Sequence, residues 1–162
     1  MAVRIVLMGV SGCGKSTVGP VVASALGVPY LDGDALHPPA NIQKMAQGIA
    51  LVDADRIPWL TDIAEHLAAG SEGAVVGCSA LTRRYRDIIR ARVPNVVFAH
   101  LDGREDVLRA RLGAREDHFM PASLLDSQLA TLEPLADDEA GAVFDIELPA
   151  AEIARRIVKW VT

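Results

Sequence analysis

The segment from Gly9 to Thr17 constrains this chain more than any other feature of its sequence. It fits the pattern G-x-x-x-x-G-K-[ST] and consists of Gly9, Val10, Ser11, Gly12, Cys13, Gly14, Lys15, Ser16 and Thr17. An apolar run precedes it and a helical pattern begins near Lys15, which is the context that the motif requires. Glycines let backbone N–H groups surround a phosphate, and the start of the helix adds the positive end of its dipole. The sequence therefore predicts a phosphate-binding loop for a nucleoside triphosphate.

Two residues of this loop carry the chemistry expected of it. Lys15 supplies a charge that reaches the β and γ phosphates of ATP, and the Ser16 hydroxyl is placed to ligate Mg²⁺. Cys13 stands at a variable position of the motif, where we interpret it as a small residue; its thiol lies near a cationic site and could react without being catalytic.

Five short apolar runs predict five strands, at residues 3–8, 29–31, 74–77, 95–100 and 142–146. Stretches with helical spacing lie between them, and such alternation is typical of a parallel sheet with right-handed crossovers. We therefore expect one domain over residues 1–162, with a three-layer α/β P-loop NTPase fold and a five-stranded parallel sheet. Its ligands should bind at the carboxyl ends of the strands. Residues 32–58 and 113–121 read as irregular, and long connections of this kind are candidates for substrate binding or a lid.

The composition argues against several classes of function. Sixteen Lys and Arg against 21 Asp and Glu give a net charge of -5 over 162 residues, so no overall positive field attracts nucleic acid or an anionic membrane. No apolar stretch approaches the roughly 18 residues of a membrane span, and the first residues do not resemble a signal peptide. The two cysteines, Cys13 and Cys78, cannot form a disulfide framework. We expect a cytoplasmic protein that binds neither nucleic acid nor membrane.

Two acids follow the second predicted strand, in the sequence Asp32-Gly33-Asp34. Strand alternation would point both carboxylates toward the same region, and the ends of neighbouring parallel strands converge on one site. We assign Asp32 to the Mg²⁺ and its waters, and Asp34 to the acceptor hydroxyl as a base or an orienting group. The alternative interpretation is a solvated Asp-Gly-Asp turn.

A dense set of hydrogen-bonding groups follows Asp34 and suits a polyhydroxylated, anionic small molecule. It consists of His37, Asn41, Lys44, Asp53, Asp55, Arg56 and Trp59, although Trp59 can equally belong to the core. An anionic acceptor needs at least one cation, and the candidates are Arg56, Lys44 and Arg83. Arg83 begins a basic helix, most of whose arginines we expect to face solvent.

These motifs resemble the gluconokinase family, from Gly9 to Pro134. The resemblance is carried by Asp32-Gly33-Asp34, Leu36-His37-Pro38, Asn41-Ile42, Lys44-Met45, Gly48, Asp53, Asp55-Arg56, Pro58-Trp59-Leu60, Cys78-Ser79-Ala80-Leu81, Tyr85-Arg86-Asp87, His118-Phe119-Met120-Pro121, Leu124-Leu125, Ser127-Gln128 and Leu132-Glu133-Pro134. The sequence departs from the family pattern at Ala50, where proline is usual, and at Thr82, where a basic residue is usual.

The resemblance implies transfer of the γ phosphate of ATP to the 6-hydroxyl of D-gluconate, giving 6-phospho-D-gluconate and ADP. It also implies Mg²⁺ dependence, a nucleoside-monophosphate-kinase-like fold and, commonly, a homodimer. The polar segment at 113–121 resembles the lid of such kinases. Arg111 and Arg115 are then expected to contact the nucleotide phosphates, Arg115 as a catalytic residue beside Lys15, Asp32 and Asp34. His37 and His118 are expected as weaker substrate contacts.

Two other functions remain open at this point. One is a P-loop kinase of another small acid, such as shikimate or adenylylsulfate, against which the residues at 58–60 and 77–81 argue. The other is a nucleotide-binding regulatory module, which would be expected to lack a positioned acid and lid arginines.

Overall fold

A computed structural model describes residues 2–113 and 123–162 of the chain. Its centre is a five-stranded sheet in the order β2-β3-β1-β4-β5, and every neighbouring pair is parallel. The strands are β1 (Val3–Met8), β2 (Tyr30–Asp32), β3 (Gly73–Gly77), β4 (Val97–Asp102) and β5 (Gly141–Asp145). Each predicted strand is confirmed to within about two residues, because short β-branched runs between helices favour buried parallel strands.

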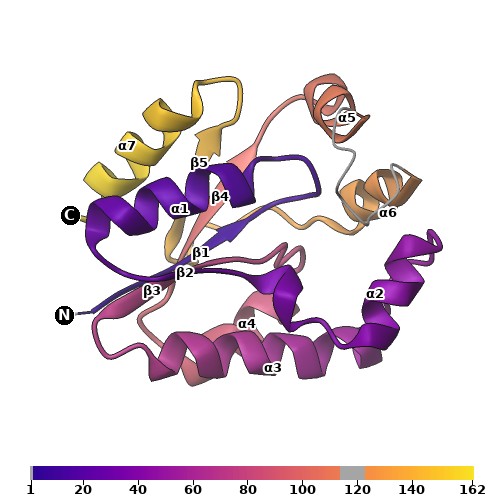
Figure 1. Cartoon of the computed structure of the whole chain (residues 1–162), viewed down its shortest axis with the longest axis horizontal. Coiled ribbons are helices and arrows are strands. Elements are labelled where there is room, and N and C mark those ends of the chain that lie inside the picture. The colour runs from indigo at the N-terminus through magenta and orange to yellow at the C-terminus, as the bar shows by residue number, and fades with distance from the viewer. Residues whose placement is uncertain (1, 114–122) are drawn as a thin grey trace.

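Helices cover both faces of this sheet (Figure 1). They are α1 (Lys15–Leu26), α2 (Pro39–Ala46), α3 (Asp53–Ala69), α4 (Arg83–Arg92), α5 (Glu105–Gly113), α6 (Ser123–Thr131) and α7 (Ala150–Val161), with a short 3-10 helix, η1, at Gly33–Leu36. Helices α1 and α7 pack together on one face, and α3 and α4 on the other. The three-layer α/β prediction is confirmed.

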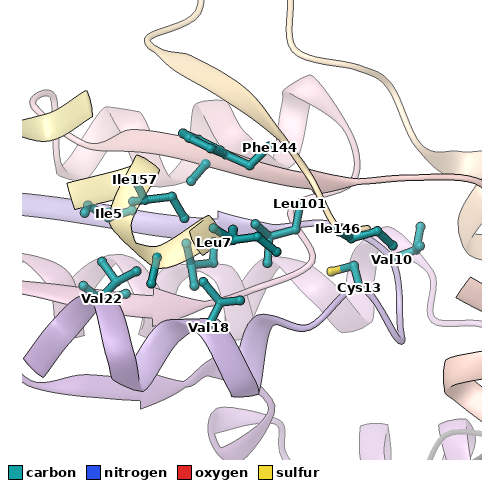
Figure 2. Close-up of a cluster of buried hydrophobic side chains, with 14 of the residues drawn as sticks. Ile5, Leu7, Val10, Cys13, Val18, Val22, Leu101, Phe144, Ile146 and Ile157 are labelled. Carbon is teal, nitrogen blue, oxygen red and sulfur yellow. The ribbon is translucent and has the colours of Figure 1, made fainter. Parts of the chain in front are cut away.

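The main core lies between the sheet and the α1 and α7 layer (Figure 2). Ile5 and Leu7 of β1 point from the sheet toward Val18 and Val22 of α1, and Ile157 of α7 completes the layer. Alternate residues of β1, Val6 and Met8, point to the opposite face and pack with α3. A central strand buried on both faces holds the phosphate loop, which follows it directly, in a fixed position.

The interpretation of residues 32–58 as irregular is wrong, because η1, α2 and the beginning of α3 occupy most of that segment. Its prolines favour a loop, but Pro39 takes a first helical position, where the missing N–H costs nothing. Helix α3 begins at Asp53 and continues through Pro58. The Asp55 carboxylate stabilises this start, since it accepts the Val52 N–H at 3.0 Å near the positive end of the helix.

Thr82 has a local role that suits its place in the chain. Its hydroxyl accepts the Tyr85 N–H at 3.2 Å and caps the start of α4. The departure from the family pattern at this position therefore exchanges a basic side chain for a helix cap.

Candidate active site

The phosphate loop leaves β1 at Gly9 and enters α1 at Lys15. Gly9 has a φ of 145°, and a Cβ there would lie 2.7 Å from the carbonyl oxygen of Leu101, so the position requires glycine. The Lys15 ammonium donates to the carbonyls of Gly9 at 2.8 Å and Val10 at 3.2 Å. It therefore lies across the loop, where it can also meet phosphate oxygens.

Neighbouring segments fix the loop at two points. The Gly9 N–H donates to the carbonyl of Ser79, after β3, at 3.2 Å. The Ser11 N–H donates to the side-chain oxygen of Gln128, on α6, at 2.7 Å. Cys13 is buried in the main core, which agrees with its interpretation as a small packing residue.

A cavity of about 570 Å³ opens beside the phosphate loop. It is lined by Gly12, Cys13, Gly14, Ser16, Thr17, Val18, Arg111, Ile146, Leu148, Ala150 and Ile153. The guanidinium of Arg111 donates to the carbonyl of Ile146 at 2.7 Å, which holds Arg111 at the wall of this cavity. The structure thus brings Arg111 beside the loop that the sequence assigned to nucleotide. The size and the mixed polar and apolar lining suit a nucleotide.

The two acids after β2 take different positions in one turn. Asp32 ends the strand, and its carboxylate accepts the Asp34 N–H at 3.0 Å, so Asp32 caps η1. The predicted strand alternation therefore stops at Asp32. Both carboxylates still lie near Tyr30. Burial raises the pKa of Tyr30, and the negative charges of Asp32 and Asp34 raise it further. The turn itself is fixed by a hydrogen bond of 2.7 Å from the Trp59 indole to the Gly33 carbonyl.

His37 and Trp59 form the wall of a polar cluster around this turn. Their rings stack with centroids 4.0 Å apart. His37 Nε2 lies 3.9 Å from a carboxylate oxygen of Asp34, and the Asn41 amide lies 3.2 Å from His37 Nδ1. Burial lowers the pKa of His37 to about 4, and the charge of Arg56 adds to this effect. His37 is therefore neutral at pH 7 and can donate or accept a hydrogen bond to a hydroxyl.

The three predicted cations have different surroundings. Lys44 donates to both carboxylate oxygens of Asp55, at 3.1 and 2.9 Å. Arg56 is only 8% exposed, and its guanidinium carbon lies 5.3 Å from the centre of the Tyr85 ring. Among the residues that the structure describes, no carboxylate lies within 4.0 Å of Arg56. A buried cation without a counter-ion is costly unless a ligand supplies one.

Arg83 does not join this cluster. Its guanidinium donates to both carboxylate oxygens of Asp138 at 2.7 Å, in an exposed pair on the segment before β5. Arg115 and His118, with nearly all of the 113–121 segment, lie outside the described residues.

Sequence reasoning did not assign functional positions to three buried residues. Tyr85 donates to Asp53 at 2.6 Å beneath Arg56, and Gln128 holds the phosphate loop. Arg86 belongs to the helix whose arginines we expected mostly to face solvent, but it is completely buried and paired with Glu139 at 2.7 Å. A signal existed for Gln128, which is a polar residue in an otherwise apolar helical pattern with Leu124 and Leu129.

Comparison with known proteins agrees with this geometry. A family model described as shikimate kinase matches residues 11–162. A gluconokinase from Gluconobacter oxydans is 52% identical over 139 residues, which cover 83% of this chain and 78% of that protein. The chain belongs to the gluconokinase family.

Solved structures of similar proteins extend the match to the fold of the whole chain. The structure of a gluconokinase from Sinorhizobium meliloti is 48% identical, with a TM-score of 0.87, over 98% of this chain and 95% of that one. An unliganded sugar kinase from Janibacter is 46% identical, with a TM-score of 0.95, over 99% of this chain and 95% of that one. The gluconokinase resemblance stated from the motifs is therefore confirmed.

Proposed function

We propose that this protein transfers the γ phosphate of ATP to the 6-hydroxyl of D-gluconate, giving 6-phospho-D-gluconate and ADP. One observation carries the proposal beyond the family match. Arg56 is a buried cation without a carboxylate partner among the described residues, and it lies beside the cluster of His37, Trp59 and Tyr85. A sugar acid supplies the missing carboxylate together with hydroxyls for the surrounding polar groups.

In this proposal the acceptor contacts are shared among the residues of that cluster. Arg56 and Lys44 bind the carboxylate, while Asn41 and neutral His37 hydrogen-bond to hydroxyls. Trp59 fixes the turn that carries Asp34, and Asp34 orients the acceptor hydroxyl or takes its proton. Arg83 and His118 are also proposed to contact the acceptor. Arg83 would first have to release Asp138, with which it is paired.

The nucleotide contacts come from the other side of the site. Within the loop from Gly9 to Thr17, the backbone N–H groups that do not already donate to protein oxygens bind the phosphates together with the Lys15 ammonium. Arg111 lines the cavity beside the loop, and Arg115 is proposed to meet the charge that develops on the transferred group. Phosphoryl transfer requires little covalent chemistry from the protein, so these contacts act by positioning and by charge.

The donor set also fits Mg²⁺. The described residues hold no group of three or more His, Cys, Asp or Glu side chains that would cage a metal. Magnesium in kinases is instead bound by one or two protein oxygens, together with phosphates and water. Ser16 and Asp32 are the oxygens that we propose for it, and the metal would neutralise charge on the β and γ phosphates.

The remaining proposals concern the whole molecule. We propose one kinase domain over residues 1–162, with a lid at about 113–121, that works in the cytoplasm as a homodimer. Both cysteines are free and buried, which supports a reducing compartment. In the described residues, no helix has the length and apolarity needed to cross a membrane.

The test is an assay of ADP release by the purified protein against gluconate, shikimate, adenylylsulfate and no acceptor. We expect turnover with gluconate alone. Turnover with another acid would favour the alternative kinase, and no turnover with any acceptor would favour a regulatory nucleotide-binding module.

An Arg56→Ala variant tests the carboxylate contact. Losing one charged hydrogen bond costs roughly 1.5 to 3 kcal/mol, so KM for gluconate should rise about 10- to 150-fold while KM for ATP changes little. The matched control is Arg84→Ala, because Arg84 is an exposed arginine paired with Asp53. An equal effect on both substrates would remove Arg56 from the acceptor pocket.

A further inference from the structure

Helix α6 contacts both halves of the candidate site. In Figure 1 it lies on the same side of the molecule as α2, above it in that view. Leu124 and Gln128 are four residues apart on α6 and therefore share one face of the helix. Both are buried, although α6 is only nine residues long.

The first of these residues contacts the acceptor segment. Leu124 packs with Met45 of α2 and with Leu51, two residues before the start of α3, in a small apolar cluster separate from the two main cores. All three side chains are buried. The same segment carries Lys44, Asn41 and Arg56, so Leu124 rests directly against the part of the chain proposed to bind the acid.

The second residue contacts the phosphate loop. Gln128 accepts the Ser11 N–H at 2.7 Å in a buried hydrogen bond between positions 117 residues apart. The segment just after α6 is connected to the same loop through residues 79–81. The Glu133 N–H donates to the Leu81 carbonyl at 2.7 Å, and two residues earlier the Ser79 carbonyl accepts the Gly9 N–H. Movement of α6 therefore cannot leave the phosphate loop unchanged.

We propose that α6 couples the acceptor segment to the phosphate loop, with Gln128 as the positioning residue on the nucleotide side and Leu124 on the acceptor side. Contact of Leu124 with Met45 holds α6 where Gln128 meets Ser11, and this position keeps the loop ready for nucleotide. The two substrates then bind cooperatively, since each stabilises the same arrangement of α6. This cooperativity rests on the proposed function, because it assumes that the segment at 37–56 binds the acid.

The experiment measures binding of AMPPNP with Mg²⁺ to the full chain, and amide hydrogen exchange of the peptide that spans residues 9–17. The variants are Gln128→Met, which keeps size but removes the acceptor oxygen, Leu124→Ala, and Met45→Ala on the distant acceptor segment. The matched control is Leu129→Ala, which shortens a leucine of the same helix that packs on the main core. Thermal unfolding of each variant confirms that it is folded.

We expect Gln128→Met to weaken AMPPNP binding about fivefold or more, and Leu124→Ala and Met45→Ala to weaken it in the same direction, each with faster exchange at Ser11. Leu129→Ala should leave both readouts near those of the wild type. In the wild type, saturating gluconate should tighten AMPPNP binding about fivefold, and all three variants should reduce this factor toward one.

The coupling would be overturned if Leu124→Ala and Met45→Ala both left AMPPNP affinity and Ser11 exchange unchanged. It would also be overturned if the control Leu129→Ala had an equal effect on these two readouts. A purely structural role of Gln128 predicts no effect of Met45→Ala on the phosphate loop. If gluconate did not bind the wild type, the proposed function would fail. The AMPPNP and exchange measurements need no acid and would still decide the role of α6.

Discussion

Replacing Glu139 with glutamine should strongly destabilise this protein, because Glu139 balances the charge of the buried Arg86. The Glu139 side chain is 1% exposed, and its two oxygens accept from Arg86 at 2.7 and 3.0 Å. Arg90 adds a contact of 2.7 Å, and the Ala136 N–H a further one of 2.8 Å. Glutamine keeps the shape but leaves the buried Arg86 cation without its counter-charge.

The expected loss is about 3 to 5 kcal/mol of unfolding free energy, which is the usual cost of removing one partner from a buried ion pair. It is a large fraction of the 5–15 kcal/mol that holds a typical domain. For a chain of this size it corresponds to a fall in Tm of about 6–20 °C. Urea unfolding at pH 7 measures the change. Asp138→Asn is the matched control, because the neighbouring Asp138 is 66% exposed in its pair with Arg83.

The pH dependence gives a second readout of the same pair. Burial alone would raise the pKa of Glu139, but hydrogen bonds from Arg86, the Ala136 N–H and Arg90 outweigh it and lower the pKa from 4.5 to about 2. The unfolded chain therefore takes up the proton first, so this stability is present above about pH 4.5 and is lost as the pH falls toward 2. Glu139→Gln should lack that part of the acid dependence.

Two outcomes would refute this reasoning. One is a Glu139→Gln variant no less stable than Asp138→Asn. The other is a double variant, Arg86→Met with Glu139→Leu, that is less stable than Glu139→Gln, because removing both charges should relieve the unpaired cation.

Three further predictions concern single residues in and after the turn that follows β2. Asp34→Asn should lower kcat by about 10² to 10⁴ if Asp34 acts as a base, with KM for gluconate little changed. Asp32→Asn should lose activity that added Mg²⁺ partly restores. If a magnesium titration instead restored Asp34→Asn and not Asp32→Asn, the roles of the two acids would be reversed. The lowered pKa of His37, about 4, means that the unfolded chain is protonated first, so stability falls as the pH drops from about 6.5 to 4. His37→Asn should flatten urea-unfolding stability over this range, and a slope unchanged from the wild type would contradict it.

The sequence by itself determined the features whose cause is local. The loop from Gly9 to Thr17 was recognisable because phosphate binding requires glycines, a lysine and a hydroxyl at fixed spacing between a strand and a helix. The inner strands β1, β3 and β4 were recognisable because a strand buried on both faces is apolar over most of its length. The half-buried edge strands β2 and β5 were recognisable as short apolar runs between helical patterns. Local spacing also placed Asp32 and Asp34 at the carboxyl end of β2 and in the turn that follows it.

Only the tertiary structure decided which polar side chains meet. Arg83 and Arg86 lie three residues apart on α4, yet Arg83 forms an exposed pair with Asp138 and Arg86 a fully buried pair with Glu139. Their partners lie more than 50 residues along the chain, and nothing in the local sequence distinguishes the two arginines. The bond from Ser11 to Gln128 spans 117 residues. The spacing of apolar residues indicates which face of a helix or strand is buried. The partner of a buried charge depends instead on where a distant segment returns to the sheet. Only the packing of the whole chain determines that position.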